Sequence, residues 1–351
     1  MNKREDNPVI LITGGSGFLG QFIIREFLDL SSPVQPKEIR VFDLKPFPPE
    51  WPENVRFIHG DVTDPASLTK AIQHVDVVIH AAAVIDWGIK DESEVLRINV
   101  GGTENVINAC KANGTPNLIL TSSLDSVYTG SPLVNIDETQ PYPTKYATSY
   151  CKSKTLAEQL IIAANGEKMK TCILRPADIY GEGDPYHIDP LIDMAKSGFY
   201  VRLGNGRAKC QHVYVGNMAH AHVLVADALL KNNTSVEGNA YFITDSQPIN
   251  FFTFFDQVVL NAGYTISPKN VWIPKGPAFI IASFAEFGAW LLRPIKKVDL
   301  KFSRFAVSYT CNDFTFTAEK AKRDFGFTPK YSSEEAMERT ASYFLSTTYK
   351  S

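Results

Sequence analysis

The sequence predicts an α/β fold in which a Rossmann-type, doubly wound parallel sheet is joined to a smaller, mostly C-terminal lobe. Short apolar runs alternate with helical patterns through the first half of the chain, and a glycine-rich motif, TGGSGFLG, closes the first run. After Pro176 the pattern is less regular and richer in aromatic residues, glycine and proline. Alternation of strands and helices is typical of a parallel sheet with helices on both faces.

Size and composition indicate a globular protein with more than one domain. The chain has 351 residues, of which 44% are hydrophobic and 21% charged, and its net charge is -3. Without a basic stripe, we expect no nucleic-acid partner. The five cysteines are scattered and form no Cys-x-x-Cys pair, which favours a reducing compartment and argues against a metal site. The mixed-charge N-terminus lacks a signal peptide, so the expected location is cytoplasmic.

The expected elements follow one another as strand and helix along the first two thirds of the chain. Predicted strands cover residues 9–12, 39–42, 55–59, 77–80, 118–121, 171–175 and 240–243. Predicted helices cover residues 17–30, 65–73, 92–112, 150–164 and 218–230. We therefore expect a dinucleotide-binding domain over 1–183, to which 213–244 returns, and a substrate-binding lobe made of 184–212 and 245–351.

The glycine-rich turn predicts where a dinucleotide binds. Gly14 permits the tight turn, Gly17 lets the backbone approach a pyrophosphate, and Gly20 lets the following helix lie close to the sheet. The phosphates are expected on free amides at the positive end of that helix, where we place Phe18 and Leu19 among the cofactor-binding residues.

Asp43 indicates which dinucleotide is preferred. It ends the second predicted strand, roughly 20 residues after the glycines, where an acid holds a ribose hydroxyl. Because its charge repels the extra phosphate of NADP, the expected cofactor is NAD. Arg40 and Lys45 lie close by and leave NADP open.

The ends of later strands supply the rest of the predicted cofactor site. Asp61 and Val62 follow the third strand and are placed to meet the adenine edge. Ala81 and Ala82 follow the fourth strand, where small side chains either admit the cofactor or simply pack a helix on the sheet. Pro176 precedes a loop that we expect over the nicotinamide.

Tyr150 and Lys154 are the candidate catalytic pair. Four residues apart in a predicted helix, they share one face, and the ammonium is expected to lower the pKa of the phenol from its usual value of about 10. An isolated pair is usually a surface aromatic and a solvated lysine, but this one follows the glycine motif and a strand that ends in hydroxyl residues. Ser123, with Ser122 as the alternative, is placed to hydrogen-bond a substrate oxygen. Asn99 either anchors Lys154 or is a plain helix residue.

The second lobe carries a strongly apolar segment, residues 279–292, followed by Arg293, Lys296 and Lys297. As a helix it would span about 21 Å, against roughly 30 Å for a bilayer core, so it is too short to cross. It either covers the lobe or lies in a membrane surface, and peripheral contact through 279–297 stays open. Aromatic side chains of this lobe either line a pocket for a flat hydrophobic ligand or form core; they are Phe251, Phe252, Phe254, Phe255, Phe279, Phe284, Phe287 and Trp290.

Taken together, the motifs resemble those of the 3β-hydroxysteroid dehydrogenase/isomerase family of extended short-chain dehydrogenases/reductases. The resemblance is carried by TGGSGFLG (13–20), NVGGTENVI (99–107), LTSSLDSVY (120–128), YCKSK (150–154), LRPADIYGEGD (174–184), HVYVGNMAHAH (212–222) and YFITDSQPI (241–249). It implies oxidation of a sterol-like 3β-hydroxyl with NAD, with Tyr150 as catalytic acid/base and Lys154 and Ser123 assisting. It also implies a homodimer through helices 92–112 and 150–164.

Several alternatives remain open within and beyond this family. Some relatives also move a ring double bond, decarboxylate the 3-oxo product, or reduce flavonoid or β-keto compounds, and the residues identify no second acid/base for double-bond migration. Nucleotide-sugar epimerases and dehydratases share the early motifs, and Arg202, Arg207, Lys209 and Arg293 keep that class open. A non-enzymatic dinucleotide sensor would not need the catalytic residues.

Overall fold

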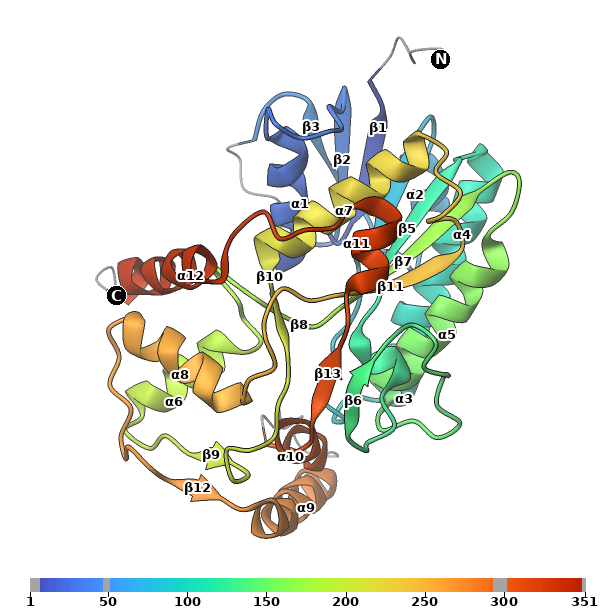
Figure 1. Ribbon diagram of the computed structural model, residues 1–351. Coiled ribbons are helices and arrows are strands. Elements are labelled where there is room, and N and C mark those ends of the chain that lie inside the picture. The colour runs from blue at the N-terminus through green and yellow to red at the C-terminus, as the bar shows by residue number, and fades with distance from the viewer. Residues whose placement is uncertain (1–6, 47–50, 293–301, 349–351) are drawn as a thin grey trace.

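A seven-stranded parallel sheet lies at the centre of the computed structural model, which describes residues 7–46, 51–292 and 302–348. Its strand order is β11-β7-β5-β4-β1-β2-β3, and the predicted fold class is confirmed (Figure 1). The strands are β1 (Val9–Thr13), β2 (Glu38–Asp43), β3 (Val55–His59), β4 (Val77–His80), β5 (Asn117–Thr121), β7 (Lys170–Pro176) and β11 (Asn239–Ile243). β3 and β4 have the predicted bounds, and each of the others is one or two residues longer.

Helices cover both faces of this sheet, and its central strands β1, β4 and β5 are buried on both sides. Ile10 and Ile12 of β1 pack into one core, and Val9 and Leu11 pack into another on the opposite face. The first face carries α1 (Phe18–Leu28), α7 (Val215–Leu230) and α11 (Glu319–Phe325). The second carries α2 (Pro65–Ala71), α4 (Gly102–Asn113) and α5 (Ser149–Ala164). Figure 1 shows α7 lying beside α1.

The predicted helix over 92–112 is built from three segments. α3 (Glu92–Leu96) is followed by a π-helical turn, Arg97–Gly101, and then by α4. The turn brings Asn99 into a buried position, where its amide group hydrogen-bonds the backbone of Val84. A π-helical turn inside a longer helix is frequent at functional sites.

The second lobe contains elements that irregular patterning concealed. Its helices are α6 (Ile188–Lys196), α8 (Phe251–Asn261), α9 (Lys275–Leu292), α10 (Arg304–Cys311) and α12 (Ser333–Thr348). Two short parallel pairs support them, β8 (Asp178–Tyr180) with β10 (His212–Tyr214) and β9 (Arg202–Leu203) with β12 (Trp272–Ile273). The aromatic residues of α8 form lobe core, so the core reading holds for them.

The chain crosses back to the sheet near its C-terminal end. β13 (Phe314–Phe316) pairs with β6 (Leu133–Ile136), and α11 packs against β11 and α7 (Figure 1). The predicted division of the chain into two domains stays a prediction. These contacts favour grouping residues 314–325 with the sheet, although the sequence predicts them to lie in the second lobe.

α9 holds the predicted apolar segment and presents most of it outward. Only Ala278 and Ala282 are buried, while Phe284 is 73% and Trp290 60% exposed. The side chains of Phe284 and Trp290 therefore face away from the core of the lobe. Within the described ranges, no helix has both the length and the apolar character needed to cross a bilayer. The basic residues Arg293, Lys296 and Lys297 lie outside the described residues.

Candidate active site

One cavity of about 400 Å³ lies at the carboxyl ends of the sheet strands, where the second lobe meets them. Ligands bind at this edge in open α/β sheets. All predicted cofactor-binding and catalytic residues line it: Gly14, Gly17, Phe18, Leu19, Gly20, Asp43, Asp61, Val62, Ala81, Ala82, Ser123, Tyr150, Lys154 and Pro176. Their proximity does not itself establish their roles, which stay predictions.

The glycine-rich turn has the shape that a pyrophosphate requires. Gly14 has a φ of +71°, and a Cβ there would lie 2.8 Å from the Cα of Ala82. A Cβ on Gly20 would collide with the carbonyl oxygen of Gly14. Gly17 begins α1 without a side-chain cap, so the first-turn amides have no intrahelical partners. These features fit the phosphates of a dinucleotide.

Asp43 stands at the end of β2 with its carboxylate fixed by backbone amides. Its oxygens accept hydrogen bonds from the amides of Ser16 and Lys45, each at 3.0 Å. Arg40 is turned away, because its guanidinium binds Glu38 and two backbone carbonyls next to α2. Of the two cations that left NADP open, only Lys45 therefore reaches the cavity.

Tyr150 and Lys154 lie on the first turns of α5, and both are buried. Thr148 caps this helix by accepting a hydrogen bond from the amide of Cys151 at 3.1 Å. The amine of Lys154 lies 5.7 Å from the ring centre of Tyr150 and donates to the carbonyl oxygen of Thr121 at 3.0 Å. The pair therefore shares a helix face, as the spacing predicts.

The expected acidification of Tyr150 is wrong for the protein residues alone. Burial raises the pKa of Tyr150 well above its usual value, the charge of Asp125 raises it further, and a hydrogen bond with Ser123 opposes the rise. Burial also lowers the pKa of Lys154 to about 8. The physical reason is desolvation. A buried phenolate loses its hydration energy, and this loss exceeds the attraction that the neighbouring amine of Lys154 provides.

The two serines after β5 have different partners. Ser122 donates to Glu158 at 2.5 Å, and Glu158 is paired with Arg175 at 2.6 Å in a buried ion pair. Ser123 is close enough to Tyr150 to share a hydrogen bond with it, and it donates to Asp125 at 2.8 Å. This geometry favours Ser123 over Ser122 as the group that meets a substrate oxygen.

Asn99 does not contact Lys154 directly. Its side-chain amide donates to the Val84 carbonyl at 3.0 Å and to the Ser153 hydroxyl at 2.9 Å, and its oxygen accepts from the Val84 amide. The described hydrogen bonds thus tie the loop after β4 to α5. Any support for Lys154 is through the position of that helix.

Sequence reasoning missed part of the cavity wall. Six further side chains with polar groups line it beside Ser123, Tyr150 and Lys154, namely Trp87, Asp125, Asp178, Tyr186, His187 and Tyr309. Burial raises the pKa of Asp125 to about 7, against its hydrogen bond from Ser123. Asp125 carried a usable signal because it stands two residues after Ser123. His187 and Tyr309 come from the second lobe, and no motif marks them.

A family model and the relatives found by sequence comparison point to the same protein family. The model of the 3-beta hydroxysteroid dehydrogenase/isomerase family matches residues 11–274. The 3 beta-hydroxysteroid dehydrogenase type 7 of Mus musculus is 34% identical, covering 95% of this chain and 94% of its own. The decarboxylating sterol-4-alpha-carboxylate 3-dehydrogenase of Schizosaccharomyces pombe is 31% identical, covering 96% and 97%.

Solved structures of the same fold come from nucleotide-sugar enzymes. The UDP-glucose 4-epimerase of Thermus thermophilus, solved in complex with NAD, superposes with a TM-score of 0.71 at 22% identity, covering 96% of this chain and 98% of its own. At this identity the likeness establishes a shared fold.

Proposed function

Because this chain belongs to the 3-beta hydroxysteroid dehydrogenase/isomerase family, we propose that it is an NAD-dependent oxidoreductase that interconverts a secondary alcohol and a ketone on a hydrophobic substrate, a 3β-hydroxysteroid or sterol. The names of its relatives support this substrate class. The observation that carries the proposal is the common cavity of the glycine turn and the trio Tyr150, Lys154 and Ser123.

The cofactor would lie along residues of the sheet edge. Its phosphates would rest on the turn at Gly14 and Gly17, its adenosine ribose on Asp43, and its adenine beside Asp61 and Val62. NAD, when bound, supplies the hydride acceptor and the positive charge of its oxidised ring. A positive charge close to Tyr150 would oppose the rise that burial causes in the pKa of its hydroxyl.

The chain's own residues handle the proton. In oxidation, the Tyr150 oxygen removes the hydroxyl proton as the carbinol carbon gives up its hydride. With substrate bound, the Ser123 hydroxyl would turn from Asp125 to donate a hydrogen bond to the substrate oxygen and hold it at hydrogen-bonding distance from Tyr150. The Lys154 ammonium lies on the same helix face, 5.7 Å from the centre of the Tyr150 ring, where it would hold the nicotinamide ribose.

Asp125 supports a second activity, migration of a double bond after oxidation. It lines the same cavity, and its Oδ1 has no hydrogen-bond partner. As a carboxylate it would take a proton from the carbon between the carbonyl and the double bond and return that proton to the far end of the double bond, conserving all atoms and electrons. A buried carboxyl beside oxyanion-stabilising hydroxyls suits this chemistry.

The dehydrogenase proposal is tested by supplying purified protein with NAD and a set of neutral 3β-hydroxysteroids, a sterol-4-carboxylate and UDP-glucose. We expect reduced cofactor to form with a sterol and not with the nucleotide sugar. Turnover of UDP-glucose without turnover of any sterol would favour the epimerase alternative, and cofactor binding without any turnover would favour a sensor. Loss of carbon dioxide from the 4-carboxylate would add the decarboxylating step.

The isomerase proposal has its own assay. A 3-oxo steroid with an unconjugated ring double bond is supplied directly, and formation of the conjugated ketone is followed by its absorbance. We expect Asp125→Asn to slow this step by about 10²-fold while hydride transfer is retained. Equal isomerisation by both proteins would remove Asp125 from that role.

Two broader expectations complete the proposal. The exposed aromatic face of α9 supports peripheral contact with a membrane, the source of a hydrophobic substrate. The α3–α4 region and α5, which pack on each other, are the proposed faces of a homodimer.

A further inference from the structure

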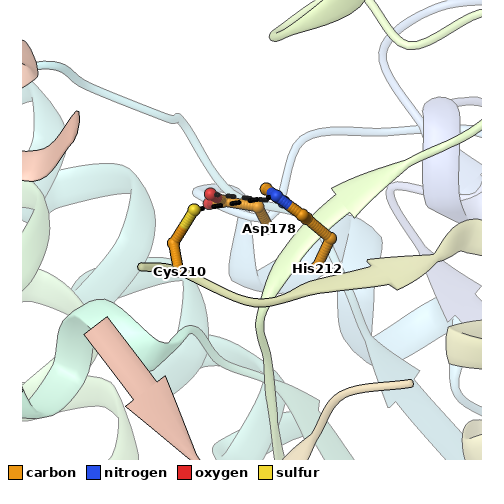
Figure 2. A group of neighbouring side chains, drawn as sticks. All are labelled: Asp178, Cys210 and His212. Carbon is orange, nitrogen blue, oxygen red and sulfur yellow. Dashed lines mark hydrogen bonds and ion pairs between the residues drawn. The ribbon is translucent and has the colours of Figure 1, made fainter. Parts of the chain in front are cut away.

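Three metal-ligating side chains meet behind the wall of the catalytic cavity. Asp178 of β8 is paired in register with His212 of β10, and Cys210 precedes His212 by two residues (Figure 2). One ligand atom from each of the three lies within 4.8 Å of the others. Of this group only Asp178 lines the cavity, and the proposed dehydrogenase uses none of them.

Two of their polar atoms lack the partners that burial normally demands, whereas the Cys210 thiol donates to the carbonyl oxygen of Ile249 at 3.4 Å. Oδ2 of Asp178 and Nδ1 of His212 face each other at 3.8 Å, and neither has a hydrogen-bond partner. His212 is fully buried and Asp178 is 9% exposed. The thiol of Cys210 lies 3.7 Å from Nε2 of the same imidazole. Buried polar groups without a hydrogen-bond partner destabilise the fold, so the cluster favours an occupant that satisfies several of them at once.

A divalent cation would balance the charge of this cluster. A thiolate and a carboxylate supply two negative charges and the imidazole supplies a neutral nitrogen, so a Zn²⁺ ion on these donors gives a site of zero net charge. Mixed sulfur, nitrogen and oxygen donors are those that zinc accepts in proteins. The hydroxyl of Tyr309 donates to the other oxygen of Asp178 at 2.5 Å, an arrangement that orients metal-bound carboxylates.

We propose that Asp178, Cys210 and His212 form a zinc site that joins β8 to β10, with a fourth position left to water. On binding, the S–H bond of Cys210 breaks, a zinc–sulfur bond forms, and the proton leaves to solvent without any redox change. Bond lengths of about 2.0–2.3 Å put tetrahedral donors roughly 3.3–3.6 Å apart, so donor atoms that now lie within 4.8 Å of one another must approach by up to about 1.5 Å. The cysteine pattern alone predicted no such site, because its ligands come from separate strands.

His187 offers the competing account of the buried carboxylate. Its Nε2 lies 3.8 Å from Oδ1 of Asp178, and its Nδ1 lies 3.3 Å from Asp184. If the imidazolium of His187 alone balances the negative charge of Asp178, that carboxylate is not available as a ligand for zinc. The two accounts differ in whether the protein binds zinc through Cys210.

Metal content of the full-length protein tests the site without reference to enzyme activity. The protein is incubated with equimolar Zn²⁺, desalted, and analysed by mass spectrometry for zinc per chain. We expect about one zinc per wild-type chain and a large loss of zinc in Cys210→Ser and His212→Gln. Cys311→Ser, which changes a thiol outside the cluster, should keep the wild-type content.

Cobalt gives a second readout, which the wild type and Cys311→Ser provide even where a variant of the cluster does not fold. Titration of the wild type and of Cys311→Ser with Co²⁺ should produce a thiolate-to-cobalt charge-transfer band of equal intensity in both. The band should be absent from Cys210→Ser where circular dichroism shows that variant folded. A wild type with neither zinc nor the band, or a folded Cys210→Ser that binds as the wild type does, would overturn the proposal.

Discussion

At the scale of single residues, burial and nearby charges together decide the pKa of one phenol, that of Tyr150. The sequence places Tyr150 and Lys154 on one helix face but does not contain the desolvation that raises the pKa of Tyr150. Nor does the sequence show that the Lys154 ammonium donates a hydrogen bond to a backbone carbonyl. The identity of the pair was therefore predictable, whereas its electrostatics depended on side chains such as Asp125 that only the folded chain brings close.

Asp125 gives a pH prediction with a definite sign. Its negative charge raises the pKa of Tyr150, so Asp125→Asn should lower that pKa and move the rising limb of kcat/KM for oxidation to lower pH. We expect a displacement of about half a pH unit to one unit. The full pH profile of each protein measures it, with the exposed Asp137→Asn as the matched control. A limb that stays in place or moves to higher pH would contradict the assigned coupling.

At the scale of elements, the strands of the sheet were the easiest to predict and the second lobe the hardest. A strand buried on both faces is a continuous apolar run, which is why the bounds of β4 were predicted correctly; β3, a half-buried edge strand, is recognisable by its alternating pattern VRFIH. α8 and α10 each bury one face, α8 against the distant α12 and α10 against α9, and because local patterns do not show these pairings, their place in the lobe was not visible from the sequence. The glycine turn was readable because backbone contacts leave no room for side chains there.

Gly20 tests the close packing of α1 on the turn. A methyl group at this position meets the backbone of Gly14 and Gly15, which cannot move aside as a flexible side chain would. Gly20→Ala should lower the free energy of unfolding by about 2–3 kcal/mol and weaken NAD binding. Urea denaturation and cofactor titration measure the two effects. Gly276→Ala, where an added Cβ meets nothing within 4 Å, is the control, and equal behaviour of the two variants would refute the packing argument.

The outward face of α9 makes a separate prediction about membranes. Replacing Phe284 and Trp290 together by serine removes exposed aromatic surface, so the melting temperature should hardly change. Binding to vesicles that contain anionic lipid should fall by at least about tenfold in a flotation assay. Leu30→Ser changes an exposed side chain that follows α1 and lies outside α9, and this variant should bind as the wild type does. A double variant that binds normally would exclude α9 as the contact.

At the scale of the whole molecule, the two parts are held together by long-range contacts that local patterns do not encode. Lys330, which follows α11, pairs with Glu26 and Asp29 at the end of α1, separated by some three hundred residues. The pairing of β13 with β6 is of the same kind. The fold class could be predicted from the local alternation of strands and helices. These long-range contacts could not be predicted, and neither could the part of the cavity wall that the second lobe supplies.

The Lys330 contacts should make stability depend on acid pH. Burial acts to raise the pKa of Glu26, but hydrogen bonds from His220 and Lys330 outweigh it, and the hydrogen bond from Lys330 chiefly lowers the pKa of Asp29. Carboxyls with depressed folded-state pKa values stabilise the fold above their ordinary values and lose that contribution as pH falls.

Lys330→Met measures this contribution. It should cost about 1–3 kcal/mol in free energy of unfolding at pH 7, because the buried Glu26 then keeps only His220 as a partner. The difference from the wild type should shrink as pH falls below about 4. Urea denaturation at several pH values checks this, with the solvent-exposed Lys231→Met as the control. A difference that is constant with pH would contradict the linkage.

Transfer of deuterium tests the central claim most directly. A 3β-hydroxysteroid labelled with deuterium on the carbinol carbon is oxidised with NAD, and the reduced cofactor is examined by mass spectrometry. The account predicts one deuterium per reduced cofactor for the wild type, and a rate lower by about 10²–10⁴-fold for Tyr150→Phe with NAD still bound. Unlabelled reduced cofactor, or undiminished transfer by Tyr150→Phe, would contradict it.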